Sequence, residues 1–250
     1  MLPPRPSEIW RIARRIVDWP RFLADYGGLT SPSREYRLRA GRVFETHALD
    51  RADVATLFAV YGREEYGRVE GGSVVVDVGA NIGGFSVYAA DQGARVYSFE
   101  PEPSNYQLLA RNVPASVATF ELAVTGREEQ RRLWLRTTSS HSMHEQRASA
   151  GSILVDCVSL GGALERCEVD RVDLLKVDVE GGEFEILYGD ADALTAVSEI
   201  RLEYHHRAAD SDPRHRLDAL DDHLEEHGFS RTLLRPTSHN SGIAWYGKSP

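Results

Sequence analysis

The sequence is poor in lysine, cysteine and long apolar runs, and each scarcity excludes a class of protein. Lysine occurs only at Lys176 and Lys248 and the formal net charge is −9, so a sequence-independent grip on nucleic acid, which needs clustered positive charge, is not expected. Cys157 and Cys167 are too few for a disulfide framework or a cysteine metal cluster. No apolar run is long enough to cross a membrane, and residues 3–6 do not begin a signal peptide. The sequence therefore predicts a cytoplasmic protein that binds neither nucleic acid nor membrane.

The length and composition indicate one α/β domain with an N-terminal appendage. The 250 residues are 42% hydrophobic and 27% charged, which is ordinary for a globular chain. Residues 7–19 place apolar side chains at helical spacing, and residues 34–46 alternate like a short hairpin. We expect residues 1–66 to form a helical and hairpin extension that covers the substrate or makes a dimer contact, and residues 67–250 to form the main domain.

A further helix is expected over residues 53–66, where it would cover an edge of the sheet. Tyr61, Glu65 and Tyr66 lie at its end, directly before the first core strand. These side chains could reach a ligand site, but packing in the core is the simpler interpretation.

Residues 74–100 have the pattern of strand, glycine loop, helix and strand. Three consecutive valines open the segment and indicate a strand that is buried on both faces. The loop DVGANIGG follows at residues 77–84, where glycines permit positive φ and a close approach of a ligand to the backbone. Glu100 follows Gly79 at close to the roughly 20 residues expected before an acid that binds a ribose. The segment predicts half of a nucleotide-binding α/β sheet.

The glycine loop differs from a dinucleotide-binding loop at one position. Asn81 occupies the middle glycine position, where a pyrophosphate needs a small residue in order to approach the backbone. Asp77 stands at the apolar end of the strand, where an unpaired carboxylate would be costly to bury. S-adenosylmethionine (SAM) has no phosphate and could use the loop backbone and Asp77. The loop thus favours SAM over NAD, with a tight turn that binds no ligand as the alternative.

Charged residues also gather at the carboxyl end of a predicted core strand at residues 172–177. Lys176, Asp178 and Glu180 alternate there, before two glycines that allow a turn. Ligands of open α/β sheets bind at this end of the strands. The three groups could simply pair with one another, but three alternating ionisable groups at a ligand-facing edge favour a functional site.

The next predicted strand ends in Glu203 and His205, which share a face if the extended backbone continues. Two roles remain open for this edge. Asp178 or His205 could act as a general base towards a substrate hydroxyl. Alternatively, Asp178, Glu203 and His205 could hold a divalent metal that lowers the pKa of that hydroxyl. The general base is favoured, and His141 in the polar segment 137–151 is a further candidate for it.

The carboxyl-terminal part completes the expected architecture. An amphipathic helix is predicted at residues 212–228, followed by an antiparallel hairpin of residues 231–235 and 242–246. Strands that alternate with helices and end in such a hairpin are typical of SAM-dependent methyltransferase domains. We therefore expect a Rossmann-like, seven-stranded α/β fold, with a mostly parallel sheet and a C-terminal antiparallel hairpin.

With these motifs together, the chain resembles the FkbM family of SAM-dependent methyltransferases. The matching segments are VVVDVGANIGGFSVYAA, SFEPEPSNYQLLARNV, LAVTG, LLKVDVEGGEFEILYG and IRLEYHH, in that order, over about residues 40–210. The pairing of DVGANIG with KVDVEG is more specific than either motif alone. The resemblance implies a Rossmann-like fold, SAM as methyl donor, and O-methylation of a hydroxyl on a sugar or secondary metabolite.

The resemblance implies that the SAM pocket is lined by Asp77, Gly79, Asn81, Gly83 and Glu100, that Ala123 packs near the adenine, and that Asp178 and Glu180 lie at the methyl-transfer site. Together with the sequence patterns above, it gives the following expected sets. The expected cofactor-binding residues are Asp77, Gly79, Ala80, Asn81, Gly83, Phe85, Glu100, Pro101, Ser104 and Ala123. The expected catalytic residues are Asp178, Lys176, Glu180 and His205. Ser104 is also expected to cap the helix at residues 105–112. The family usually has Thr-Leu-Asp before the KVDVEG strand, whereas this chain has Ser159-Leu160-Gly161, which leaves the loop contact of that missing carboxylate open.

Two other functions remain as alternatives. In an NAD-dependent oxidoreductase, Glu100 would hold the ribose of the nicotinamide cofactor, but Asn81 and the lack of a Tyr-x-x-x-Lys pair argue against it. In a non-catalytic SAM-fold binding protein, the charges at both strand ends would have no purpose. The expected partner is a small hydroxylated molecule, and a homodimer is left open.

Overall fold

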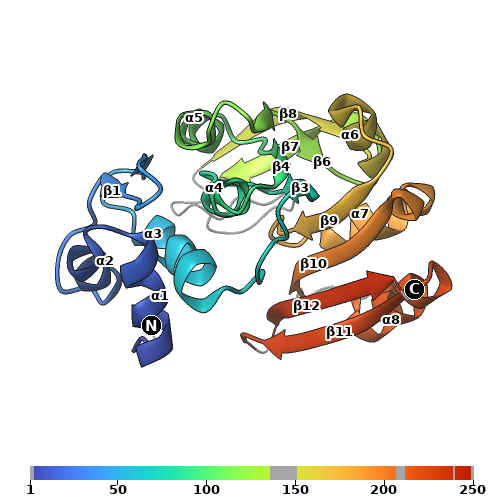
Figure 1. The fold of residues 1–250 in the computed structure, drawn as a ribbon. Coiled ribbons are helices and arrows are strands. Elements are labelled where there is room, and N and C mark those ends of the chain that lie inside the picture. The colour runs from blue at the N-terminus through green and yellow to red at the C-terminus, as the bar shows by residue number, and fades with distance from the viewer. Residues whose placement is uncertain (1–2, 136–150, 207–211, 239, 249–250) are drawn as a thin grey trace.

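The computed structural model describes residues 3–135, 151–206, 212–238 and 240–248, and a seven-stranded sheet forms its centre (Figure 1). The strand order is β11-β12-β10-β9-β3-β4-β5. The bounds are β3 Val74–Val78, β4 Arg95–Phe99, β5 Ala118–Phe120, β9 Val172–Val177, β10 Val197–His205, β11 Phe229–Pro236 and β12 Ser241–Lys248. Strand β12 runs antiparallel to β10 and β11, and the other neighbours are parallel. The predicted Rossmann-like sheet with a C-terminal hairpin is confirmed.

Helices cover both faces of this sheet, which explains the continuous apolar runs of its strands. The helices are α4 Gly84–Asp91, α5 Pro103–Asn112, α6 Leu160–Cys167, α7 Glu183–Gly189 and α8 Leu217–Glu226, with short 3₁₀ turns at Ala191–Ala196 and Pro213–His215. Val75 and Val96 pack in the core that contains α4, whereas Val76 and Tyr97 pack in the core of α6, α7 and α8. Successive strand residues therefore fill opposite cores. In the described part of the chain, no helix combines the length and apolar character needed to span a bilayer.

The N-terminal region packs on the α4 face of the sheet (Figure 1). It consists of α1 Pro6–Arg15, α2 Trp19–Tyr26, β1 Glu35–Arg37, β2 Val43–Glu45, α3 Arg51–Phe58 and the π-helix η1 Ala59–Arg63. The expected hairpin is β1–β2, where Tyr36 pairs with Phe44. The helix predicted at 7–19 is instead divided, because Ile16 is extended and forms a bridge with Leu38. Phe22 of α2 shares a hydrophobic core with Val75 of β3, so the N-terminal region packs directly on the main sheet. The domain boundary expected at residue 66 stays a prediction.

The structure contains a second, three-stranded sheet that the sequence pattern did not predict. It has the order β6-β8-β7, with β6 Ala123–Val124, β7 Glu129–Leu135 and β8 Gly151–Val158. The sequence of residues 119–124 would be read as one strand, but the chain changes sheets there, between the end of β5 at Phe120 and the start of β6 at Ala123. Phe120 stacks on Phe99 of β4 with ring centroids 4.6 Å apart, whereas Ala123 pairs with Cys157 of β8.

Candidate active site

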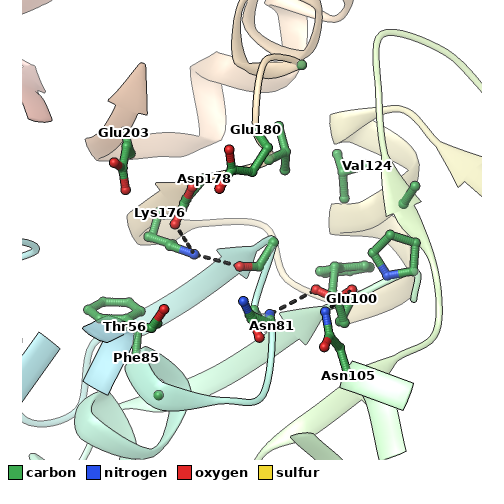
Figure 2. A pocket seen from close by; sticks show the side chains of 18 of the residues that line it. Thr56, Asn81, Phe85, Glu100, Asn105, Val124, Lys176, Asp178, Glu180 and Glu203 are labelled. Atoms are coloured by element: carbon green, nitrogen blue, oxygen red, sulfur yellow. Dashed lines mark hydrogen bonds and ion pairs between the residues drawn. The ribbon is translucent and has the colours of Figure 1, made fainter. Parts of the chain in front are cut away.

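A cavity of about 340 Å³ lies at the carboxyl ends of the central strands, a volume typical of small-molecule sites. The strand order reverses between β3 and β9, and ligands of open α/β sheets bind at such a switch point. Figure 2 shows two groups of polar side chains at opposite ends of this cavity: Asn81, Glu100 and Asn105 at one end, and Lys176, Asp178, Glu180 and Glu203 at the other.

The loop after β3 is shaped by residues with left-handed backbone. Gly79 and Gly83 have φ of 77° and 91°, and Asn81 has φ of 53°. A Cβ atom at position 79 would lie 1.8 Å from the carbonyl oxygen of Asp178, so only glycine lets the β3 and β9 loops meet. The side-chain oxygen of Asn81 accepts a hydrogen bond from the backbone N–H of Ile82 at 2.7 Å. The loop thus lines the cavity with Gly79, Ala80 and Asn81.

Glu100 closes one end of the cavity with a carboxylate held by backbone donors. Its oxygens accept hydrogen bonds from the N–H groups of Asn81 and Glu102, each at 2.9 Å. Burial raises the pKa of Glu100 to about 7, although these hydrogen bonds act to lower it. Helix α5 begins beside it and is capped by Glu102, whose carboxylate accepts from the N–H of Asn105 at 2.7 Å. The expected cap Ser104 is therefore wrong; its hydroxyl donates to Glu102 at 2.5 Å.

Lys176 is a buried cation that joins the two loops. Its Nζ donates to the carbonyl oxygen of Gly79 at 2.7 Å and lies 3.1 Å from Asp77 and 3.7 Å from Asp178. Burial acts to lower the pKa of Lys176, but the charges of Asp77 and Asp178 outweigh burial and raise it. Lys176 is accordingly an ammonium that positions its neighbours. Asp77 is fully buried and also accepts a hydrogen bond from Ser86 at 2.6 Å.

The other end of the cavity is acidic. Asp178 and Glu203 both lie within hydrogen-bond distance of the hydroxyl of Tyr66, at 2.9 and 3.2 Å. Burial, followed by the charge of Asp178, raises the pKa of Glu203 to about 8, while the charge of His205 acts to lower it. This end therefore holds one carboxyl, that of Glu203, which can exchange a proton near neutral pH.

His205 lies among carboxylates and is held as a cation. Its Nδ1 donates at 2.9 Å to the buried Glu183, and its Nε2 lies 3.7 Å from Glu180 and 3.8 Å from Glu203. Burial acts to lower the pKa of His205, but the hydrogen bond and charge of Glu183, with the charges of Asp178 and Glu180, raise it to about 10. A protonated imidazole cannot accept a proton, so the geometry argues against His205 as the base.

The structure does bring together the three residues considered for a metal. Asp178, Glu203 and His205 offer donor atoms that all lie within 4.8 Å of one another. A metal ion would need the neutral form of His205, whereas the surrounding carboxylates favour the imidazolium. We therefore assign no metal to this group. His141, the further candidate base, lies outside the described residues.

Most of the expected site residues meet at the cavity. Those that line it are Gly79, Ala80, Asn81, Phe85, Glu100, Pro101, Ala123, Lys176, Asp178 and Glu180. Those that do not line it are Asp77, Gly83, Ser104 and His205. Asp77 and His205 act through neighbours that do line it, because Asp77 pairs with Lys176 and His205 contacts Glu180 and Glu203.

Several lining residues were not singled out by the sequence. They include Thr56 and Arg63 of the N-terminal region, Asn105 at the start of α5, and Arg131 of β7. Asn105 could have been found, because it follows Glu100 directly after a turn. Thr56, Arg63 and Arg131 had no local signal, since the folding of distant segments brings them to the cavity.

The sequence is similar to known methyltransferases. The family described as Methyltransferase FkbM domain matches residues 77–231. The hexuronic acid methyltransferase AglP of Haloferax volcanii is 29% identical over 135 residues, which cover 53% of this chain and 56% of that protein. The methyltransferase sdnD of Sordaria araneosa is 31% identical over 153 residues, covering 46% of this chain and 59% of that protein. The chain thus spans little more than half the length of these curated relatives.

Among solved structures, the magnesium protoporphyrin IX methyltransferase ChlM from Synechocystis PCC 6803 with bound SAM is similar at a TM-score of 0.45 and 14% identity. The similarity covers 79% of this chain and 78% of that one. The family match extends over more than half of the sequence and includes both the glycine loop and the β9 end of the cavity. The chain belongs to the FkbM family of methyltransferases.

Proposed function

We propose that this chain is a SAM-dependent methyltransferase that O-methylates a hydroxyl of a sugar or secondary metabolite. The observation that carries the proposal is a single cavity whose two ends differ in chemistry. Glu100 and Asn105 at one end suit a ribose, and Asp178 and Glu203 at the other suit removal of a hydroxyl proton. Membership of a methyltransferase family supports methyl transfer, and the hexuronic acid in the name of AglP supports a sugar acceptor.

The residues at the Glu100 end fit the adenosine part of SAM. The side-chain oxygen of Asn105 is buried and has no hydrogen-bond partner among the described residues. Its side-chain nitrogen lies 3.5 Å from the carboxylate of Glu100. A buried acceptor without a partner needs a donor. The hydroxyl groups of a ribose supply donors to both the amide oxygen and the carboxylate.

The charge of the cavity favours SAM over a dinucleotide. Among the described residues that line it, six carry a carboxyl group and three are lysine or arginine. The cations are paired: Arg63 with Glu65 at 3.2 Å, Arg131 with Glu185 at 2.7 Å and Lys176 with Asp77 at 3.1 Å. A pyrophosphate would add negative charge to this surrounding, whereas SAM carries a sulfonium and an ammonium.

The chain's own residues supply proton removal and alignment. SAM, when bound, supplies an electrophilic methyl carbon. The acceptor O–H bond must break as its oxygen forms a bond to that carbon, so a base has to lie within reach of the hydroxyl. Lys176 and His205 carry protons, which leaves the carboxylates of Asp178 and Glu203 for this role. The walls of the cavity, including Phe85 and Leu133, exclude water and align the acceptor.

Calorimetry with SAM and with NAD separates this proposal from an oxidoreductase. We expect SAM to bind and NAD not to bind, and the reverse result would contradict the proposal. Mass spectrometry of products from a panel that includes glucuronic acid, other sugars and hydroxylated metabolites then tests the transfer. Asp178→Ala should abolish turnover while SAM binding survives. A chain that binds SAM but methylates nothing in the panel would favour the non-catalytic alternative. The cytoplasmic location and the homodimer stay predictions.

A further inference from the structure

Tyr66 reaches the acidic end of the cavity from outside the family match. It lies between η1 and β3, whereas the match begins at residue 77. Its backbone carbonyl accepts a hydrogen bond from the guanidinium of Arg201. Its side chain is 5% exposed, and its ring lies 5.4 Å from the ring of Phe85 and 5.4 Å from Nζ of Lys176. The N-terminal region therefore places the phenol of Tyr66 in a fixed position at the acidic end of the cavity.

The hydroxyl of Tyr66 lies between two carboxylates but has only one proton to share. Asp178 Oδ2 is 2.9 Å away and Glu203 Oε2 is 3.2 Å away. Burial and the charges of Asp178 and Glu203 raise the pKa of Tyr66 far above its usual value, so the phenol stays protonated. When it donates to Asp178, its oxygen faces the carboxyl of Glu203. That contact is favourable only if Glu203 carries a proton and donates it.

The charges around Glu203 favour a proton on its carboxyl group. The titratable and charged groups that face it are Asp178, Glu180 and Lys176 from the β9 end, Glu65 and Tyr66 from the N-terminal region, and His205 from its own strand. Lys176 is already bonded to Gly79, and His205 to Glu183. The negative charge beside Glu203 is thus only partly compensated, and the carboxyl holds its proton up to a pH of about 8.

We propose that Tyr66 is a positioning residue that joins Asp178 and Glu203 into one carboxylate pair with a shared proton, and that this pair takes the proton of the acceptor. The proposal rests on the O-methyltransferase function above. In the ionised pair, the acceptor hydroxyl transfers its proton to Glu203 as its oxygen bonds to the methyl carbon and the carbon–sulfur bond breaks. The products are the methyl ether, the protonated pair and S-adenosylhomocysteine. Tyr66 donates its hydrogen bond to Asp178 before and after the proton transfer, and so keeps the two carboxyl groups in fixed positions relative to each other.

Kinetics of Tyr66→Phe test the positioning role. In the wild type, kcat should rise with pH about a midpoint near 8, because the ionised pair is the active base. Removing the hydroxyl removes the acceptor of the Glu203 proton, so the midpoint should move down by about one pH unit. The plateau value of kcat should fall about tenfold, because the two carboxyls are no longer held in place, without a change in SAM affinity. Tyr61→Phe is the matched control, because the Tyr61 hydroxyl is buried in the same region without a hydrogen-bond partner among the described residues. Equal pH profiles for Tyr66→Phe and Tyr61→Phe would overturn the proposal.

An infrared titration tests the shared proton without any acceptor or SAM. The wild-type spectrum minus that of Glu203→Gln should contain the C=O band of one protonated carboxyl at pH 7, and this band should disappear as the pH rises through about 8. Tyr66→Phe should lose the band at lower pH than the wild type. Absence of the band at pH 7 would contradict the shared proton even if methyl transfer occurs. A band that behaves as expected in a chain that does not bind SAM would contradict only the proposed function. If Tyr66→Phe fails to fold, the Glu203→Gln comparison still decides.

Discussion

The ammonium of Lys176 donates a 2.7 Å hydrogen bond to the backbone carbonyl of Gly79, and this bond ties the loop after β9 to the loop after β3. The two loops carry the two motifs whose pairing marks the family. Lys176 also faces Asp77 and Asp178, so a single buried cation holds the glycine loop and the acidic end of the cavity in a fixed relation. The two ends of the cavity are therefore coupled through one residue.

Gly79→Ala should disrupt this junction. The added methyl group would collide with the carbonyl oxygen of Asp178 at 1.8 Å, and a left-handed backbone costs a residue with a Cβ about 1–2 kcal/mol. We expect SAM affinity to fall by at least about tenfold, or about 1.4 kcal/mol. Gly72→Ala is the matched control, because Gly72 has a similar φ of 85° but open space around its Cβ position. Calorimetry of the two variants checks this, and equal SAM affinities would contradict the collision.

Lys176→Met should destabilise the fold because it leaves Asp77 buried without its counter-charge. The side chains of Lys176 and Asp77 are 4% and 0% exposed. Removing one member of such a pair costs about 3–5 kcal/mol, whereas replacing both is often tolerated. Denaturant unfolding should show this loss for Lys176→Met and a recovery of most of it in Asp77→Asn/Lys176→Met. Lys248→Met, at the only other lysine, removes hydrogen bonds to two carbonyl groups and should cost only about 1 kcal/mol. A double variant as unstable as the single one would refute the ion-pair account.

The central sheet was predictable because its information is local. The buried runs in β3 and β9, the glycine loop after β3 and the acid after β4 each lie within a few residues, and the expected strand ends meet where the order reverses. The three-stranded sheet was not predictable in this way. Whether a short apolar strand such as β6 joins the main sheet or β8 depends on pairing across the fold, which no local pattern records.

The same limit applies to the site. Asp178, Glu180 and Glu100 were found because they follow buried strands, but the role of Tyr66 depends on two carboxylates far along the chain. The structure also explains why this chain has Gly161 where the family usually has an aspartate. The N–H of Gly161 donates to Asp190 at 2.7 Å, and a Cβ at position 161 would lie 2.8 Å from that carboxylate. A carboxylate from another segment thus occupies the place beside residue 161, where an aspartate would meet both steric and like-charge repulsion.

SAM affinity should depend on pH through Glu100. Because burial raises the pKa of Glu100 to about 7, the carboxyl is protonated below that pH and ionised above it. A ribose hydroxyl donates best to the ionised form, so binding below pH 7 must release a proton. The dissociation constant should therefore fall about tenfold from pH 6 to pH 8, with most of the fall below pH 7, and level off above pH 8. Glu100→Gln should bind SAM more weakly with no such dependence. Calorimetry between pH 6 and pH 8 checks this, and a wild-type affinity that does not change with pH would contradict the role of Glu100.

Removal of divalent metal should leave methyl transfer unchanged. The carboxylates at the acidic end of the cavity that could ligate a metal are already engaged, since Tyr66 lies between Asp178 and Glu203, and His205 faces Glu180 and Glu203 as an imidazolium. A metal ion would have to displace the proton of His205 and compete with Tyr66 for oxygen atoms. The initial rate should therefore be the same before and after treatment with EDTA, and added Mg²⁺ or Mn²⁺ should not raise it. His205→Gln serves as a control, because it removes the imidazole ligand but keeps a donor towards the carboxylates. A rate that EDTA abolishes and Mg²⁺ restores in the wild type, but not in His205→Gln, would place a metal among these three residues and refute the proton-sharing pair.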